Sequence, residues 1–402
     1  MADKTAIFES TQALFCALAD YVGKGSINKV FDLKKFATYR EFKNKNNFDK
    51  IIQTAFQRQI DTPGVTLADM EKLLTSENSW YESSVLIAKT LIEEITSIDT
   101  DFRNIQAPKW SDVFYHRGDA GVMGKIGELF KIANNNSKLS YTKSIPFSNI
   151  NKWSPADMYF VSKDAKNVIA KELTEAKQNT RAYTFIELND MIADLIDKGD
   201  LLPLSLKKTT SSVILDKVNF DRNTEDKKLK NFQYVKTSDW KPYAINKPQT
   251  RDLQIFFVPG AKDVIKFRHD PSTPAFKGEF ISPKNPESRG GSLGDGPLSD
   301  IFGIYDKSFG SSFRTSFKAA DKDFRERVKK LGPKPTDKKL KAEYDEQRAQ
   351  LSALYVTNKV FPPVIKWLNA DKKRATMFVK TTFQYVTSRS TSSSRFVIAK
   401  GG

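Results

Sequence analysis

Between residues 153 and 215, short apolar runs alternate with an amphipathic segment of helical period. The runs Trp153 to Val161 and Leu201 to Lys207 have the length and composition of strands, whereas Tyr183 to Lys198 carries its apolar side chains on one helical face. Gly199 follows that segment, and glycine commonly ends helices. Because a sheet must cover its apolar faces, such an order predicts a mixed α/β fold with a central mixed sheet flanked by helices.

The rest of the chain carries further runs of both kinds. We expect additional strands at Ser211–Leu215, Leu253–Val258, Ile265–His269, Ala275–Phe280 and Met377–Val386. Helical patterns begin at Leu298 and cover Leu351–Leu368.

The start of the chain has helical patterns throughout. The run from Trp80 to Ile98 is the longest amphipathic segment there, and a break follows at Ala107-Pro108. With 402 residues the chain is long enough for two or three domains. We therefore expect a helical N-terminal region at 1–105 and an α/β domain at 106–402.

Two insertions are expected within the second domain. Residues 283–297 are rich in Pro, Gly and Ser, a composition typical of flexible loops. Residues 321–350 are polar and basic, which predicts a helical insertion.

The formal net charge is +17 at pH 7. A surplus of this size favours polyanions through steering and counterion release. No run reaches the length of apolar sequence that a membrane helix needs, and the first residues lack a signal-peptide layout. We therefore expect a nucleic-acid partner, DNA before RNA, and no membrane. The expected location is the cytoplasm, that of the host cell if the protein is viral.

The chain has one cysteine and two histidines. One cysteine excludes an internal disulfide framework and a cysteine-based zinc cluster, and two histidines are too few for a histidine-based metal site. Cys16 lies in an apolar helical run and is expected to be a buried small hydrophobe. An enzyme of this composition would work with carboxylates, lysines and hydroxyls.

Four residues in the middle of the chain form a candidate constellation. Period-two alternation places Ser205 and Lys207 on one face of the same strand. A lysine on a mostly apolar strand needs an acidic partner if its amine is buried. Asp157, on a strand of its own, is the natural candidate, and Glu128 on a preceding helix could complete the group.

This order of Glu128 on a helix, Asp157 on a strand and Ser205-x-Lys207 on the next strand resembles the PD-(D/E)xK nuclease-like superfamily, phage-encoded members among them. The resemblance covers residues 115–215. It implies a restriction-endonuclease-like sheet and an endonuclease that hydrolyses DNA phosphodiester bonds with Mg²⁺ (or Mn²⁺). It also implies that Asp157 is the main metal ligand, that Glu128 supports the metal, and that Lys207 orients or deprotonates the attacking water.

Ser205 departs from the family's pattern, which has Asp, Glu or sometimes Gln two residues before the lysine. Either Asp157, Glu128 and a backbone carbonyl hold the metal, or the site is weakened or inactive and the protein binds nucleic acid or serves a virus structurally. Each residue also has an ordinary explanation. Asp157 would cap a turn, Glu128 would be a solvated helix residue, and Lys207 would keep an edge strand from aggregating.

Further basic residues are candidate nucleic-acid contacts, namely Lys208, Arg289, Arg325, Lys329 and Lys330. The glycines after Arg289 could cradle a phosphate, but the nucleotide-binding ending Gly-Lys-Thr/Ser is missing. The stretch around Arg325 is either a solvated helix pair or a phosphate-contacting arm. A module that binds an acidic protein is a third alternative for the whole chain.

Overall fold

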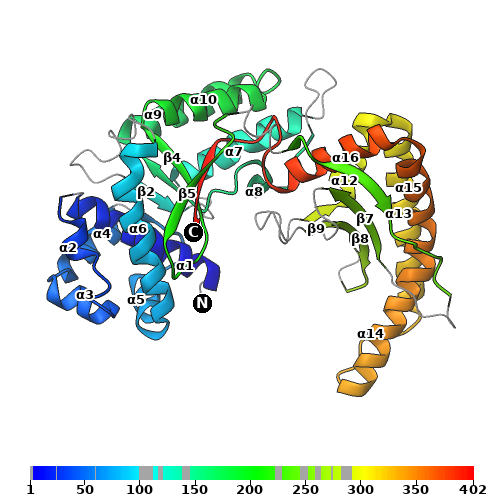
Figure 1. Ribbon diagram of the computed structural model, residues 1–402, viewed down its shortest axis with the longest axis horizontal. Coiled ribbons are helices and arrows are strands. Elements are labelled where there is room, and N and C mark those ends of the chain that lie inside the picture. The colour runs from blue at the N-terminus through cyan, green and yellow to red at the C-terminus, as the bar shows by residue number, and fades with distance from the viewer. Residues whose placement is uncertain are drawn as a thin grey trace. The chain divides into compact units, whose positions relative to one another are not determined.

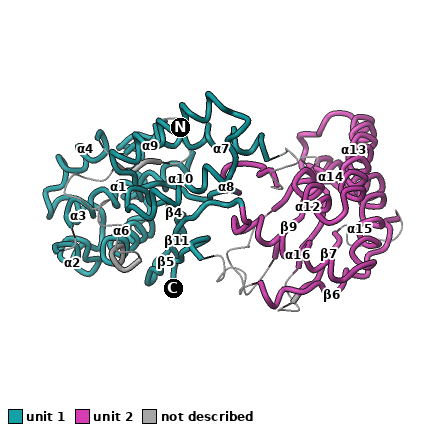
Figure 2. The backbone as a smooth tube through the Cα atoms, turned by 90° about the horizontal axis from the view of Figure 1, so that it is seen from above, with its two compact units in different colours: residues 1–144, 153–221, 392–402 teal, residues 145–152, 222–391 magenta. Residues whose placement is uncertain are grey.

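The structure is a computed structural model that describes residues 3–23, 25–58, 60–98, 112–115, 121–137, 145–221, 229–244, 252–258, 264–272, 275–281 and 292–402. The chain forms two compact units (Figure 2). Unit 1 comprises residues 1–144, 153–221 and 392–402, and unit 2 comprises 145–152 and 222–391. The boundary expected near residue 105 therefore falls within the first segment of unit 1, and the C-terminal residues return to that unit.

Unit 1 opens with a group of helices (Figure 1). These are α1 (Lys4–Val22), α2 (Ile27–Val30), α3 (Tyr39–Lys45), α4 (Asp49–Arg58), α5 (Leu67–Ser76) and α6 (Asn78–Ile98). Thr38 and Thr66 begin α3 and α5 with capping boxes, in which the threonine and an acidic residue three positions on satisfy each other's backbone N–H groups. The core is aromatic, because Phe15 packs against Phe31, Phe42 and Tyr81.

A six-stranded sheet follows, in the order β1-β2-β3-β4-β11-β5. Its strands are β1 (Ile60–Asp61), β2 (Asp112–Tyr115), β3 (Met158–Val161), β4 (Leu201–Leu206), β5 (Val213–Val218) and β11 (Phe396–Gly401). The sheet is mixed, since β1 is parallel to β2 and β11 is parallel to β4, whereas the other neighbours are antiparallel. The C-terminal strand thus separates two strands that are consecutive in the sequence.

Helices flank this sheet. Helices α1 and α6 contact β2 and β5, whereas α7 (Gly121–Asn136) and α10 (Phe185–Asp197) contact β2 and β4. Helix α9 (Lys163–Gln178) packs on α7, and the short α8 (Ile150–Trp153) precedes β3. Thr184 caps α10 with Glu187, and Gly199 turns the chain into β4 with a φ of 74°. The predicted strand–helix–strand segment is confirmed.

Unit 2 contains an antiparallel sheet in the order β10-β9-β8-β7-β6. Its strands are β6 (Gln233–Thr237), β7 (Leu253–Val258), β8 (Val264–Asp270), β9 (Ala275–Ile281) and β10 (Ser292–Gly294). Its helices are α12 (Asp295–Tyr305), α13 (Lys307–Lys329), α14 (Lys338–Ser352), the π-helix η3 (Ala353–Thr357), α15 (Asn358–Ala370) and α16 (Lys372–Val386). Phe267, Phe276, Phe302 and Phe378 form much of its core.

The predicted fold class is confirmed at the level of a mixed α/β protein with two sheets and flanking helices. The strand predicted at Met377–Val386 is wrong, because these residues belong to α16. The buried side chains of that segment recur at helical spacing, as Phe378, Thr382 and Val386 illustrate. Packing of this face outweighed the strand preference of its aromatic and β-branched residues.

The two predicted insertions differ in outcome. The predicted loop at 283–297 lies in part outside the described residues, and its last residues form β10 and the start of α12. The basic stretch 321–350 is helical, as expected, with a break between α13 and α14. In the described part of the chain, no helix combines the length and apolar character that crossing a bilayer requires.

Candidate active site

Asp157 lies directly before β3 and is fastened to β4. Its backbone N–H donates to the Leu204 carbonyl at 2.8 Å. Its Oδ2 accepts from the Leu206 N–H at 2.7 Å and from the Ser205 hydroxyl at 3.3 Å. In the β3–β4 register Met158 faces Leu204, and the hydrogen bond from Asp157 extends that register by one pair. The carboxylate and the Ser205 hydroxyl therefore share one face of the sheet.

Lys207 follows the last residue of β4. Its N–H donates to the Ala399 carbonyl at 2.9 Å, so the pairing with β11 continues one residue past the strand. Alternation then directs its side chain to the face of Ser205 and Asp157. Diagonal neighbours in an antiparallel pair lie about 7–8 Å apart, within reach of a lysine. The amine is exposed rather than partly buried as the sequence predicts, because β4 ends at Leu206.

Glu128 lies on α7 and forms an ion pair with Lys177 of α9, with 2.5 Å between Oε2 and Nζ. Its side chain is half-exposed, and the pair links the two packed helices. Any part of Glu128 in metal binding would compete with this pair.

The described residues contain no group of three or more His, Cys, Asp or Glu side chains arranged to hold a metal ion. Mg²⁺ in proteins is commonly held by one or two carboxylates together with waters and substrate phosphates. Asp157 suits that arrangement, because its carboxylate is held by two hydrogen bonds at the rim of the sheet. The site fits a divalent ion when a phosphate supplies further ligands.

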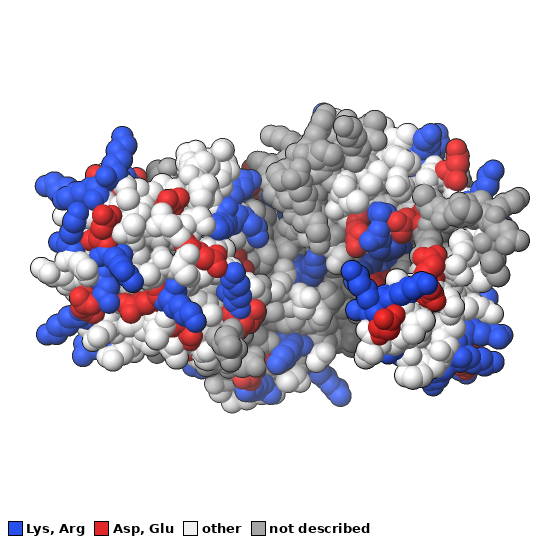
Figure 3. Space-filling model, turned by 90° about the horizontal axis from the view of Figure 1, so that it is seen from below, with Lys and Arg blue, Asp and Glu red and all other residues white. Residues whose placement is uncertain are grey.

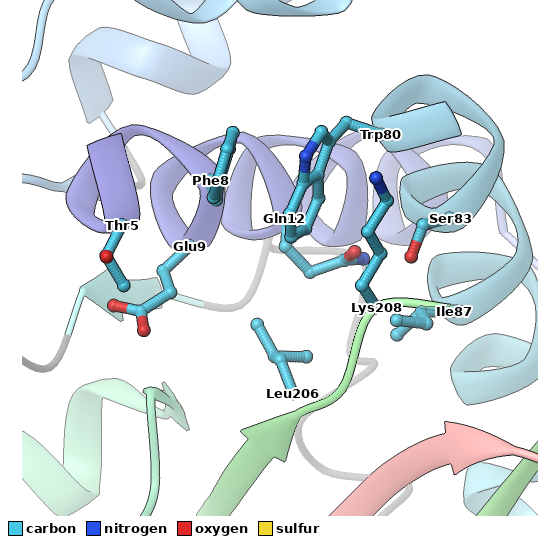
Figure 4. A pocket seen from close by; sticks show the side chains of 9 residues that line it. All are labelled: Thr5, Phe8, Glu9, Gln12, Trp80, Ser83, Ile87, Leu206 and Lys208. Carbon is cyan, nitrogen blue, oxygen red and sulfur yellow. The ribbon is translucent and has the colours of Figure 1, made fainter. Parts of the chain in front are cut away.

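A cavity of about 150 Å³ lies beside the end of β4 (Figure 4). Leu206 points into it from β4, Glu9 and Gln12 from α1, and Trp80 from α6. Because Leu206 alternates with Ser205, the cavity lies on the opposite face from Asp157.

Helix α6 fixes the chain just after Lys207. Lys208 donates to the Ser79 hydroxyl at 2.8 Å, and its Nζ lies 4.6 Å from the centre of the Trp80 ring. The Thr209 N–H donates to the Ser83 hydroxyl at 3.1 Å. Sequence reasoning missed this connection, since nothing in the local pattern links residue 208 to residue 80. Lys208, predicted to bind nucleic acid, is exposed but its amine already serves this internal contact.

The other predicted nucleic-acid contacts differ in their surroundings. Arg289 lies outside the described residues. Arg325 pairs with Asp321 at 2.6 Å, whereas Lys329 and Lys330 are exposed at the end of α13. On the face drawn in Figure 3, lysine and arginine side chains are spread among aspartates and glutamates rather than gathered in one patch.

A buried polar network in unit 2 contains the residue types of a hydrolytic triad. His269 Nδ1 lies 2.8 Å from the Ser352 hydroxyl, and Nε2 lies 3.6 Å from Asp321 Oδ1. Burial lowers the pKa of His269 to about 4, which outweighs the opposite effect of Asp321. Ser352 is only 3% exposed, so a substrate cannot reach its hydroxyl. The network connects β8 to α13 and α14.

Comparisons with models of known families, with curated proteins and with solved structures gave no match. The function of this chain must therefore be inferred from the site itself.

Proposed function

We propose that unit 1 hydrolyses phosphodiester bonds of DNA with a divalent metal ion, at the rim where β3 begins and β4 ends. The observation that supports this proposal is the position of Asp157. Its carboxylate is bound to the Leu206 N–H and the Ser205 hydroxyl, directly before Lys207 on the same strand. A carboxylate and an amine brought to one edge of a mixed sheet agree with the restriction-endonuclease-like arrangement.

The chemistry assigned to each residue follows from its charge and place. Asp157 would hold Mg²⁺ or Mn²⁺, which when bound polarises a phosphate and lowers the pKa of a bound water. Lys207, exposed and cationic, would orient that water and stabilise the negative charge that develops on the phosphate. Glu128 would assist only after leaving Lys177. The net charge of +17 favours a polyanionic substrate.

The test is a cleavage assay on duplex DNA, single-stranded DNA and RNA. We expect cleavage with Mg²⁺ or Mn²⁺ that disappears in EDTA. Asp157→Asn and Lys207→Gln should each abolish it while the fold is retained. The matched control is Asp194→Asn with Lys198→Gln, an exposed ion pair of the same unit, which should cleave normally. Cleavage that persists in EDTA, or in both site variants, would exclude the proposal.

A second candidate is a nuclease-like protein that binds nucleic acid without turnover, as a binding or viral structural protein. Ser205 favours it, because a neutral hydroxyl occupies the position where the family carries an acid, and it donates to Asp157. The pairing of Glu128 with Lys177 favours it as well. This candidate predicts salt-sensitive binding that metal ions leave unchanged and no cleavage products under any metal condition.

A further inference from the structure

Helices α13 and α14 form a hairpin whose tip lies away from the core of unit 2. The turn between them contains Gly332, which has a φ of 79°. Figure 1 shows α14 extending away from the sheet and the other helices of this unit. The buried residues of α14 are Ala349 and Ser352, both in its last turns. Its earlier turns therefore contribute little to the core.

The tip is strongly basic. Residues 327–341 contain seven lysines and arginines against one aspartate, which gives a net charge of +6. By contrast, residues 342–352 contain one arginine against three acidic residues. The positive charge is therefore concentrated around the turn.

The base of the hairpin and its tip differ in how their charges are used. At the base, Arg325 pairs with Asp321 and Lys359 pairs with Asp323, each at 2.6 Å. Near the tip, Lys334 pairs with Asp345 at 3.1 Å. Five further lysines of the tip are exposed, and the described residues provide no ion pair for them: Lys329, Lys330, Lys338, Lys339 and Lys341.

Helix stability does not explain the lysines at the start of α14. Lys338, Lys339 and Lys341 lie in its first turn, where the positive end of the helix dipole disfavours cations. Asp337 caps the helix by accepting from the N–H groups of Lys339 and Leu340 at 2.9 and 3.0 Å. The cap offsets part of this cost but leaves the side-chain amines exposed. A bound polyanion would turn the same charges into a favourable interaction.

We propose that the basic tip, residues 329–341, binds the phosphate backbone of a nucleic acid. The choice of partner rests on the proposed function. A membrane-surface helix would need a broad apolar face, and within the tip Leu340 is the exposed large apolar residue. An acidic protein partner would need an apolar centre to the interface, which this surface lacks. Flexible lysines spaced along a projecting hairpin suit a phosphate backbone, which requires no base-specific contact.

The experiment compares two variants of the full chain in EDTA, where metal-dependent cleavage cannot interfere. The tip variant carries Lys→Gln at 329, 330, 338, 339 and 341. The control variant carries Lys→Gln at 307, 318, 366, 372 and 373, which are exposed lysines elsewhere in unit 2. Both variants remove the same charge, and glutamine preserves helix propensity. Fluorescence anisotropy with a labelled DNA duplex, at several salt concentrations, gives the affinity and its salt dependence.

We expect the tip variant to bind more weakly, with a log–log salt slope less steep by about 0.9 for each phosphate that the protein no longer neutralises. The control variant should keep most of the wild-type slope. Thermal unfolding should show the tip variant as stable as the wild type or slightly more stable.

Equal binding by the two variants would overturn the proposal. So would a wild-type protein that binds anionic phosphatidylserine vesicles and not DNA. The result is separable from catalysis. Tip-dependent binding without cleavage would reject the nuclease alone, and cleavage with tip-independent binding would reject the tip alone.

Discussion

The carboxylate of Asp157 accepts a hydrogen bond from the backbone N–H of Leu206 at 2.7 Å. This hydrogen bond fixes the acidic side chain at the β3–β4 rim relative to Lys207. Asp157 and Leu206 are 49 positions apart in the sequence. The same hydrogen bond supports both the fold of unit 1 and the proposed chemistry, so the two roles must be tested separately.

Replacing Asp157 should separate the two roles. Asp157→Ala leaves the half-buried Leu206 N–H without its acceptor, which should cost about 1–3 kcal/mol of unfolding free energy. Asp157→Asn keeps an oxygen acceptor and should cost less, although cleavage is abolished in both. Ser205→Ala is the control, since it removes only the longer 3.3 Å bond and should cost under about 1 kcal/mol. Urea unfolding measures all three, and equal costs would contradict the assignment.

Ser205→Glu should restore the acid that the resemblance implies. Ser205 is buried, so a second carboxylate beside Asp157 should lower the melting temperature in EDTA through repulsion and crowding. Mg²⁺ should then raise it, by about 2.7 kcal/mol of stability when free Mg²⁺ is 100 times the dissociation constant. Ser205→Gln has similar size without the charge and should not respond to Mg²⁺. An identical response of both variants would argue against a metal at this rim.

Lys208 and Trp80 should be energetically coupled, because the amine lies over the indole ring. A double-mutant cycle with Lys208→Met and Trp80→Leu should give a coupling of about 0.5–1 kcal/mol in urea unfolding. Ser79→Ala tests the separate hydrogen bond of the same amine. Additive effects of the two substitutions would show that α6 does not hold the end of β4 through this pair.

Unit 2 should lose stability in mild acid because of His269. Burial lowers its pKa from 6.5 to about 4, although Asp321 and Asp270 act in the opposite direction and Arg325 acts with burial. The unfolded chain therefore binds a proton at higher pH than the folded one. The contribution is complete above pH 6.5 and declines as the pH falls toward 4. Unfolding free energies of His269→Gln should depend less on pH across that window, and an unchanged slope would exclude His269 as the cause.

Gly310 should be required where α12 meets α13. A Cβ there would lie 2.6 Å from the Ser299 carbonyl and 2.7 Å from Gly303 Cα, both backbone atoms that cannot yield alone. Gly310→Ala should cost about 1–3 kcal/mol or more through overpacking. Gly303→Ala is the matched control, since its Cβ meets nothing within 4 Å. Alanine there should be neutral or stabilise α12 by up to about 1 kcal/mol. Similar melting temperatures for the two variants would contradict this account.

Local patterns determined much of this fold. The threonine cap of α10, its apolar face and Gly199 are adjacent in the sequence, and all the information for that helix lies within a few turns. Strands β4, β7, β8 and β9 were predictable for the same reason, because alternation and apolar runs are local properties. The sequence also predicted that Asp157 and Ser205 belong to strands of one sheet, which the β3–β4 pairing confirms.

Tertiary structure alone decided which distant segments meet. Strand β11 lies between β4 and β5 because its register satisfies both neighbours, a choice no local pattern contains. Packing made α16 a helix despite its strand-like residues. It also paired Glu128 with Lys177 and left Lys207 exposed beyond the end of β4. The sequence by itself determined the elements, whereas burial and long-range pairing determined their order in space and the surroundings of the candidate site.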